Sequence, residues 1–151
     1  MTRLLLQTDG GSRGNPGPAA YGFVVYDVTN QPGAGLTRRS SQAGAGNLPE
    51  KCGNYLGETT NNQAEYAGLI AGLSWILANH PEAEVEIKMD SLLIVNQVKG
   101  LYKVKSPDLF PKFQEVRGLL AKFPKWNIAH TYRSGNSLAD SLVNEALDAR
   151  S

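Results

Sequence analysis

Residues 8–22, TDGGSRGNPGPAAYG, join two apolar runs, residues 4–6 and 23–26, and decide how the chain begins to fold. A connection so rich in glycine and proline is typical of a tight turn between antiparallel strands. A turn does not explain Asp9, because a carboxylate at the end of an apolar strand loses its hydration unless a positive group pairs with it. The stretch therefore predicts a hairpin that carries an acid in need of a cation.

The pattern of apolar residues along the whole chain predicts a sheet flanked by helices. We expect strands at about residues 3–9, 19–28, 84–89 and 126–132, a further extended stretch between residues 34 and 57, and helices at about residues 61–79, 91–99, 107–122 and 136–149. Early strands joined by turns favour antiparallel pairing, whereas later strands separated by helices favour parallel crossovers. The sequence therefore predicts an α/β fold (mixed α+β) in a single domain that covers residues 1–151.

Composition limits the kinds of site that the chain can hold. The 151 residues, 41% of them hydrophobic, suffice for one core but not for two domains, and no stretch resembles a signal peptide or a membrane span. We therefore expect a soluble, cytoplasmic protein with no membrane partner. Cys52 is the only cysteine and His80 and His130 are the only histidines, so a metal would be held by oxygen ligands, which favours Mg²⁺ or Mn²⁺.

Besides Asp9, three acids occur where an expected element begins or ends: Glu65, Asp90 and Asp140. Each has an ordinary structural explanation. Glu65 and Asp140 lie near helix N-termini, where a negative charge is favourable, and Asp90 could cap the helix that follows it. If the strands that carry Asp9 and Asp90 are neighbours, however, the carboxylates converge and repel one another unless cations bind between them. Two hard cations held by such a cluster suit phosphodiester hydrolysis and need no serine or cysteine nucleophile.

Basic residues gather in the second half of the chain, although the net charge of +1 argues neither for nor against a polyanionic partner. The set begins with Lys99, Lys103 and Lys105 and continues with Lys112, Arg117, Lys122 and Lys125. Two interpretations stay open for this set. It is either a solvated helix face or an edge that faces the phosphates of a nucleic acid.

Four segments, in the same order and across nearly the whole chain, resemble type 1 ribonuclease H. They are TDGGSRGNPGPAAYG (8–22), ETTNNQAEYAGLIAGL (58–73), KMDSLLIVNQVKG (88–100) and YRSGNSLADSLVNEAL (132–147). The resemblance implies the ribonuclease H-like fold, a five-stranded mixed sheet in the order 3-2-1-4-5 flanked by helices. It also implies endonucleolytic cleavage of the RNA strand of RNA–DNA hybrids with two Mg²⁺ ions, for which Mn²⁺ can substitute. The products would carry 5′-phosphate and 3′-hydroxyl ends, and the enzyme, which we expect to be a monomer, would remove RNA primers and R-loops.

By position in these segments, the resemblance implies that Asp9, Glu65, Asp90 and Asp140 are the metal ligands. It also implies a set of substrate contacts, which comprises Gly10, Gly11, Asn15, Thr60, Asn61, Asn62 and Asn136. Backbone amides and helix N-termini bind phosphate without reading bases, while RNA is distinguished through its 2′-hydroxyl. A purely local alternative for Asn61 and Asn62 is capping of the helix, where Thr60 and Gln63 predict a capping box.

The match is incomplete at the auxiliary group that precedes the last acid. Many family members carry a mobile histidine there, and His130 lies ten residues before Asp140. His130, however, falls within the expected strand, and members more similar to this chain carry arginine at the position of Arg133. We therefore favour Arg133 as the catalytic auxiliary cation and His130 as a packed strand residue.

The chain also departs from the family between Asp90 and Asp108, where the Trp-rich basic protrusion of other members is missing. We therefore expect hybrid affinity to be modest and strongly dependent on salt. Residues 38–53 form a longer segment than the family leads us to expect, and their sequence indicates no role. The alternatives are another nuclease of the same fold, which TNNQAE (60–65) and the short length disfavour, and a non-catalytic hybrid-binding module, which four intact acids disfavour.

Overall fold

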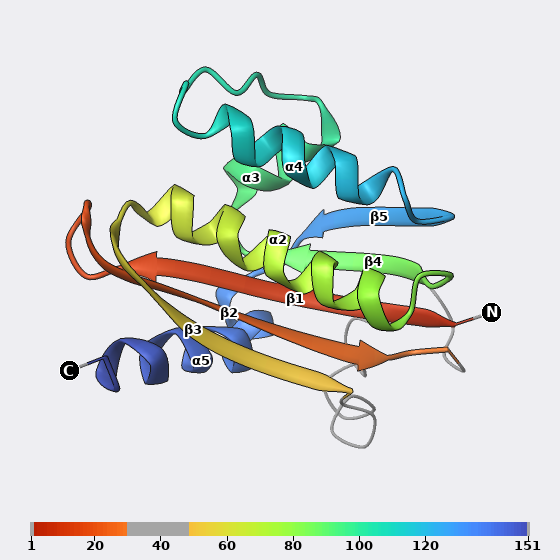
Figure 1. Ribbon diagram of the computed structural model, residues 1–151, viewed down its shortest axis with the longest axis horizontal. Coiled ribbons are helices and arrows are strands. Elements are labelled where there is room, and N and C mark those ends of the chain that lie inside the picture. Colours follow the sequence, from red (N-terminus) through yellow and green to blue (C-terminus); the bar gives the residue numbers. More distant parts are fainter. Residues whose placement is uncertain (1, 30–48, 151) are drawn as a thin grey trace.

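The computed structural model describes residues 2–29 and 49–150, which form a five-stranded sheet flanked by helices (Figure 1). The strands are β1 (Arg3–Ser12), β2 (Gly17–Asp27), β3 (Glu50–Thr59), β4 (Glu84–Met89) and β5 (Lys125–His130). The helices are α2 (Asn61–Asn79), α3 (Leu92–Lys99), α4 (Phe110–Leu120), the short 3₁₀ helix η1 (Arg133–Asn136) and α5 (Ser137–Asp148). The strands lie in the order β3-β2-β1-β4-β5, which confirms the expected sheet.

The sheet is mixed in the way that the order of elements predicts. β2 pairs antiparallel with β1 and with β3, whereas β4 pairs parallel with β1 and with β5. β1 and β2 extend further into the glycine-rich stretch than expected, because residues 10–12 pair with residues 19–21 and leave only residues 13–16 for the turn. β3 begins at Glu50, within the expected range of 34–57, and extends beyond it to Thr59. The part of that range before residue 49 lies outside the described residues, as does most of segment 38–53.

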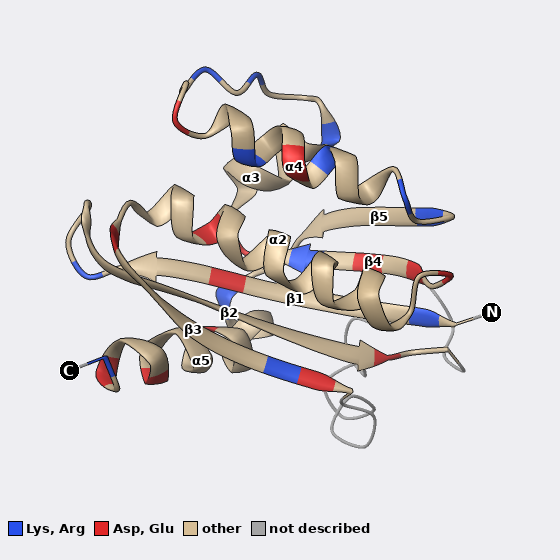
Figure 2. Cartoon of the chain, viewed as in Figure 1, with Lys and Arg blue, Asp and Glu red and all other residues tan. Residues whose placement is uncertain are grey.

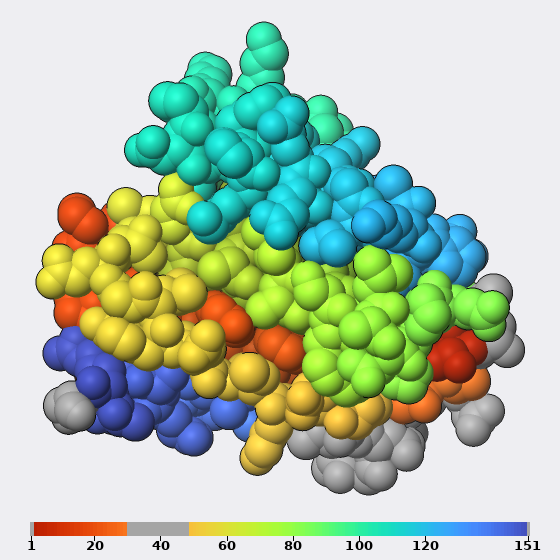
Figure 3. Space-filling view, in the orientation of Figure 1, coloured from red at the N-terminus to blue at the C-terminus, as the bar shows by residue number. Residues whose placement is uncertain are grey.

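Helices cover both faces of the sheet. α2 and α4 lie over one face, whereas α5 lies against β1, β2 and β3 on the other (Figure 1). Successive side chains of β1 point to opposite faces of the sheet, so each face has its own apolar core. Leu6 packs with Leu73 of α2 on one face. Its neighbour Leu5 packs on the other face with Val24 of β2 and with Leu142 of α5. The space-filling view shows α2 and α4 over the first face, with β3 uncovered beside α2 and only small patches of the first two strands visible between them (Figure 3).

The helices lie close to where the sequence predicts them. α2 spans the expected range, whereas α4 and α5 are shorter than expected because residues 107–109 precede α4 as a turn and η1 precedes α5. Over residues 2–29 and 49–150, no helix combines the length and the apolar character that crossing a lipid bilayer requires.

Candidate active site

Parallel pairing of β1 with β4 brings two of the predicted acids to the same edge of the sheet. Thr8 lies opposite Met89 in the register, so Asp9 and Asp90 follow at adjacent positions. The hydroxyl of Ser91, not the carboxylate of Asp90, caps α3 by accepting a hydrogen bond from the amide of Ile94 at 3.3 Å. The capping role that offered an ordinary explanation for Asp90 therefore belongs to its neighbour.

Glu65 joins these acids because α2 lies unusually close to β1. A Cβ atom added at Gly10 would lie 2.4 Å from the backbone of Ala64 and of Glu65, so only glycine permits this approach. Thr60 caps α2 by accepting a hydrogen bond from the amide of Gln63 at 3.2 Å. The side chain of Gln63 donates instead to the carbonyl oxygen of Asp108, so only half of the predicted capping box is present.

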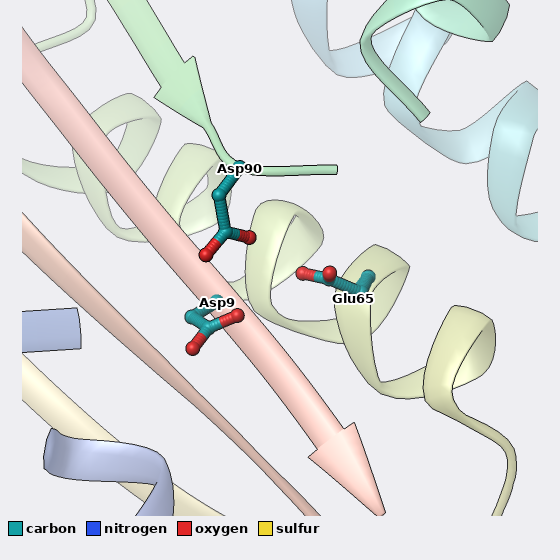
Figure 4. A group of neighbouring side chains, drawn as sticks. All are labelled: Asp9, Glu65 and Asp90. Atoms are coloured by element: carbon teal, nitrogen blue, oxygen red, sulfur yellow. The ribbon is translucent and has the colours of Figure 1, made fainter. Parts of the chain in front are cut away.

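The carboxylates of Asp9, Glu65 and Asp90 form the acid cluster of this structure. One oxygen atom from each lies within 4.8 Å of the other two (Figure 4). Asp140, in the first turn of α5, stands outside that tight group but forms a side-chain hydrogen bond with Asp9. The structure thus brings all four predicted acids to one place, from parts of the chain that are far apart in the sequence.

Electrostatics show that the acid cluster is unfavourable when it is fully ionised. Burial, followed by the charge of Asp90, raises the pKa of Asp9 to about 8. Burial is also the largest cause that raises the pKa of Glu65 well above its ordinary value, and the charges of Asp9 and Asp90 add to it. The pKa of Asp90 is raised by burial and lowered again by the charge of Arg133. A bound cation would offset both effects.

Two oxygen atoms of the acid cluster are buried without a hydrogen-bond partner among the described residues, Oε1 of Glu65 and Oδ2 of Asp90. Buried carboxylate oxygens of this kind are costly unless a proton donor or a metal ion pairs with them. The donor set consists of oxygen alone, which is the set that Mg²⁺ and Mn²⁺ prefer. The residues present therefore fit hard divalent cations.

Arg133 and His130 lie in different relations to the acid cluster. Arg133, the first residue of η1, is exposed, lines the cavity over the acids and lowers the pKa of Glu65 and of Asp90 by its charge. His130 lies in β5, as expected, but it is the last residue of that strand, which was expected to continue to residue 132, and it is exposed instead of packed. Its ring contacts the ring of Tyr132, 5.8 Å away between centroids, in an edge-on arrangement.

Asn136 lies beneath the acid cluster, not on the surface where a substrate contact was expected. It is completely buried, and its side-chain Nδ2 donates to the carbonyl oxygen of Thr8 at 2.8 Å. Its side chain also forms a hydrogen bond with Asp90, which lowers the pKa of that acid. Asn136 therefore acts on the site by positioning β1 and Asp90.

The hairpin residues and the start of α2 hold each other through their asparagine side chains. Oδ1 of Asn61 accepts hydrogen bonds from the backbone amide of Ser12 at 2.8 Å and from its hydroxyl at 3.1 Å. Oδ1 of Asn15 accepts a hydrogen bond from the backbone amide of Asn61 at 3.0 Å. Both asparagines are exposed and also carry N–H donors, while Asn62 beside them is half-buried. The side chain of Asn61 thus bonds the hairpin instead of capping α2, which Thr60 does, so the capping alternative is wrong for Asn61. Asn15 and Asn61 keep N–H donors for a ligand.

These elements enclose an open cavity of about 330 Å³ above the acids. The lining includes all four acids together with Gly10, Gly11, Asn61 and Arg133. It also includes Ser12, Arg13 and Asn144, which the sequence did not single out. Asn144 carried a usable signal, because it lies four residues after Asp140 and so on the same helix face.

Comparisons with known proteins agree with this geometry. A family model described as Reverse transcriptase-like matches residues 7–146. A bifunctional protein of Mycobacterium tuberculosis is 39% identical over 147 residues, which make up 97% of this chain and 36% of that protein. The ribonuclease HI of Halobacterium salinarum is 40% identical over 140 residues, which make up 93% of this chain and 62% of that protein. This chain therefore spans less than two thirds of the length of either relative.

Among solved structures, LC11-RNase H1 in complex with an RNA/DNA hybrid superposes with a TM-score of 0.81. It is 38% identical in sequence, and the superposition covers 98% of this chain and 99% of that one. The fold is therefore shared, over nearly its whole length, with a protein that has been seen with a hybrid bound.

Proposed function

This chain belongs to the type 1 ribonuclease H family, and from that premise we propose that it is an endoribonuclease that hydrolyses the RNA strand of RNA–DNA hybrids. The observation that carries the proposal is the acid cluster, in which three carboxylates lie within 4.8 Å of one another at the floor of an open cavity. Burying such a cluster destabilises the fold, so its presence is explained by a function that needs it. The hybrid-bound relative supports the substrate class.

Asp9, Glu65, Asp90 and Asp140 are proposed to hold two Mg²⁺ ions, with Mn²⁺ able to replace them. When bound, these ions activate a water molecule for in-line attack and stabilise the departing oxygen. The carboxylates supply the negative charge that retains the ions and, once ionised, carry no proton that would compete with them. Cleavage in this manner leaves 5′-phosphate and 3′-hydroxyl ends.

Other residues of the chain position the RNA strand and the acids. Asn136 fixes the end of β1 and the carboxylate of Asp90 from below, so that the ligand geometry does not depend on substrate. The exposed guanidinium of Arg133 provides a permanent positive charge for a phosphate in the cavity. We place the protein in the cytoplasm as a monomer that removes RNA primers and R-loops, and we assign hybrid contacts to Gly10, Gly11, Asn15, Thr60, Asn61 and Asn62.

An end-labelled RNA–DNA hybrid, incubated with and without Mg²⁺, tests the proposal. Single-stranded RNA, double-stranded RNA and double-stranded DNA serve as parallel substrates. We expect Mg²⁺-dependent cleavage of the RNA strand of the hybrid and no cleavage of the DNA duplex. Cleavage of the DNA would favour a transposase-like nuclease of the same fold, and binding of the hybrid without any cleavage would favour a non-catalytic module.

A further inference from the structure

Arg13 occupies a position over the cavity that none of the assigned roles uses. It is the first residue of the turn between β1 and β2, and it lines the same cavity as Asp9 and Asp140. Its backbone amide donates to the carbonyl oxygen of Pro18 at 2.8 Å, which fixes the base of the turn. The direction in which the side chain leaves the hairpin is therefore set by the fold.

The guanidinium of Arg13 is engaged by an acid at the end of α5. Nη2 of Arg13 lies 2.8 Å from Oδ1 of Asp148, and the two side chains are 45% and 70% exposed. Figure 1 shows the hairpin and the C-terminal end of α5 at the same end of the molecule. An ion pair that is so exposed is weak and is readily exchanged for another partner.

Helix stability does not explain Asp148. It is the last residue of α5, where the helix dipole disfavours a negative charge. Asp148 is not among the residues that line the cavity, whereas its neighbour Leu147 is. Its pairing with Arg13 is the interaction that gives the carboxylate a role.

The chemistry of Arg13 suits a phosphate. Its planar guanidinium donates two parallel hydrogen bonds to a phosphate group, a geometry that a lysine cannot supply. A strand whose scissile phosphate lies over the acids presents its neighbouring phosphates at a regular spacing on either side of it. Besides the acids, the lining is made of hairpin residues, Asn61, Arg133 and residues of α5, and its two cations among the described residues are Arg13, on the hairpin, and Arg133, on η1.

We propose that Arg13 binds a phosphate of the RNA strand beside the scissile one, and that Asp148 competes with the RNA for its guanidinium. This inference rests on the proposed function, because it takes the strand over the acid cluster to be RNA. It makes Asp148 an internal mimic of the phosphate, which holds Arg13 in a binding orientation and lowers the affinity for substrate. Release of Asp148 is then part of substrate binding.

The first test measures binding of a fluorescently labelled RNA–DNA hybrid over a range of salt concentrations, in EDTA so that no strand is cut. We expect Arg13→Ala to weaken binding by about threefold to tenfold and to lower the slope of log K against log salt by about one unit. Lys51→Ala is the matched control, because Lys51 is an exposed cation on β3 and does not line the cavity. Equal effects of the two variants would overturn the inference.

The second test uses Asp148→Asn, which keeps the shape of the side chain and removes its charge. We expect this variant to bind the hybrid about twofold to fivefold more tightly, as expected for the release of one phosphate-binding cation. Glu82→Gln, at an exposed acid in the turn before β4, controls for the change in net charge. In an Arg13→Ala background the gain from Asp148→Asn should be at most half as large, and an equal gain would show simple repulsion and overturn the competition.

Cleavage of the hybrid by the wild-type protein, measured in parallel, separates the two levels of proposal. A wild-type protein that neither binds nor cleaves the hybrid would contradict the proposed function itself. Normal cleavage with an unchanged salt slope in Arg13→Ala would contradict only the role of Arg13. Asp148→Asn removes an unfavourable charge from a helix end, so this variant should fold even if Arg13→Ala does not. Its affinity for the hybrid then tests the competition between Asp148 and the RNA.

Discussion

The acid cluster and the lysine segment, residues 99–105, both concentrate charge of one sign, but they differ in burial and in how closely the charges approach one another. The acid cluster gathers like charges in a buried place, from β1, α2 and the end of β4, and leaves two of its oxygen atoms without a partner among the described residues. The lysine segment, which carries Lys99, Lys103 and Lys105, keeps its charges exposed and separated. Figure 2 shows basic residues spread over α3, α4 and the loop that joins them.

The difference teaches which parts of the protein depend on geometry and which depend only on charge. Metal-assisted chemistry needs ligands fixed in space, so the chain uses Gly10 and Asn136 to hold the acids close together. Attraction of a polyanion needs only positive charge within a screening length. Substitution in the acid cluster should therefore abolish turnover at little cost to folding, whereas substitution in the lysine segment should weaken affinity by degrees.

The largest effect should follow from Asp9→Asn. We expect turnover on the hybrid to fall by about a hundredfold or more, because loss of one shared ligand costs several kcal/mol of transition-state stabilisation. The thermal midpoint should not fall, because the change removes a charge from a repulsive cluster. The two measurements are made together on the same sample.

Asp108→Asn provides the control for Asp9→Asn, because Asp108 is an exposed acid outside the lining of the cavity. Its turnover should equal that of the wild type. Activity of Asp9→Asn above about one per cent of wild type would contradict the metal-binding role of Asp9, since a shared ligand is worth more than that.

A smaller effect should distinguish Arg133 from His130. We expect Arg133→Ala to lower turnover by about tenfold to a thousandfold, as for the loss of one electrostatic donor at a developing charge. His130→Ala should change it by less than about threefold, because His130 is exposed at the end of β5 and does not line the cavity. Turnover is measured against pH for both variants and for the wild type on one hybrid.

The pH profile adds a second criterion to this comparison. An arginine remains charged throughout the neutral range and contributes no titration there. A histidine that acted as general acid or base would produce a step near pH 6 to 7 that disappears in His130→Ala. A large loss in His130→Ala with a small loss in Arg133→Ala would therefore reverse the assignment.

Replacement of Lys99, Lys103 and Lys105 together by alanine should have a more modest effect. We expect hybrid affinity to fall by about tenfold and the slope of log K against log salt to drop by about one unit for each phosphate that is no longer neutralised. Turnover at saturating substrate should stay close to that of the wild type. An unchanged slope would instead favour a solvated helix face, in which Lys99 serves only to stabilise the C-terminus of α3.

The arrangement of the strands could be predicted from the sequence, whereas the hydrogen-bond partners of single polar side chains could not. The order of elements predicted a mixed sheet, and the resemblance supplied the strand order. The meeting of Asp9 with Asp90 was expected on the condition that their strands are neighbours, because parallel neighbours end at the same edge. The roles of individual polar side chains did not follow. Asn61 holds Ser12, and Asn136 holds Thr8, across 49 and 128 residues of sequence.

Long-range hydrogen bonds of this kind produce no periodic pattern in the sequence. An asparagine looks the same in the sequence whether its amide caps a helix, bridges buried groups or contacts a ligand. The ion pair of Arg13 with Asp148 was missed for the same reason, since its partners lie near opposite ends of the chain. Gln63 shows the limit of a motif as well, because tertiary contact with Asp108 competes with the local cap. The sequence thus predicts which residues meet in the folded protein better than it predicts the hydrogen-bond partner of each residue.

The smallest effect is on stability, and it follows from the raised pKa of Asp9. In the unfolded chain this carboxyl ionises near its ordinary value of 3.8, whereas burial and the charge of Asp90 raise its pKa to about 8 in the folded protein. Between these two values the folded state keeps a proton that the unfolded state has released. The free energy of unfolding therefore falls as the pH rises through this window, and the contribution is fully present only below it.

We expect a fall on the order of 1 kcal/mol between pH 5 and 8 in EDTA, well below the limit of about 1.4 kcal/mol for each pKa unit, because water can enter the open cavity and relax the cluster. Thermal midpoints should reflect it as a decrease of a few degrees, roughly 2–8 °C. Mg²⁺ should reverse the decrease at pH 8 and have little effect at pH 5, because cations bind the ionised acids and compete with protons. Asp9→Asn should show a flatter pH dependence and a smaller response to Mg²⁺. A wild-type midpoint that rose with pH in EDTA would contradict the repulsive cluster on which the comparison rests.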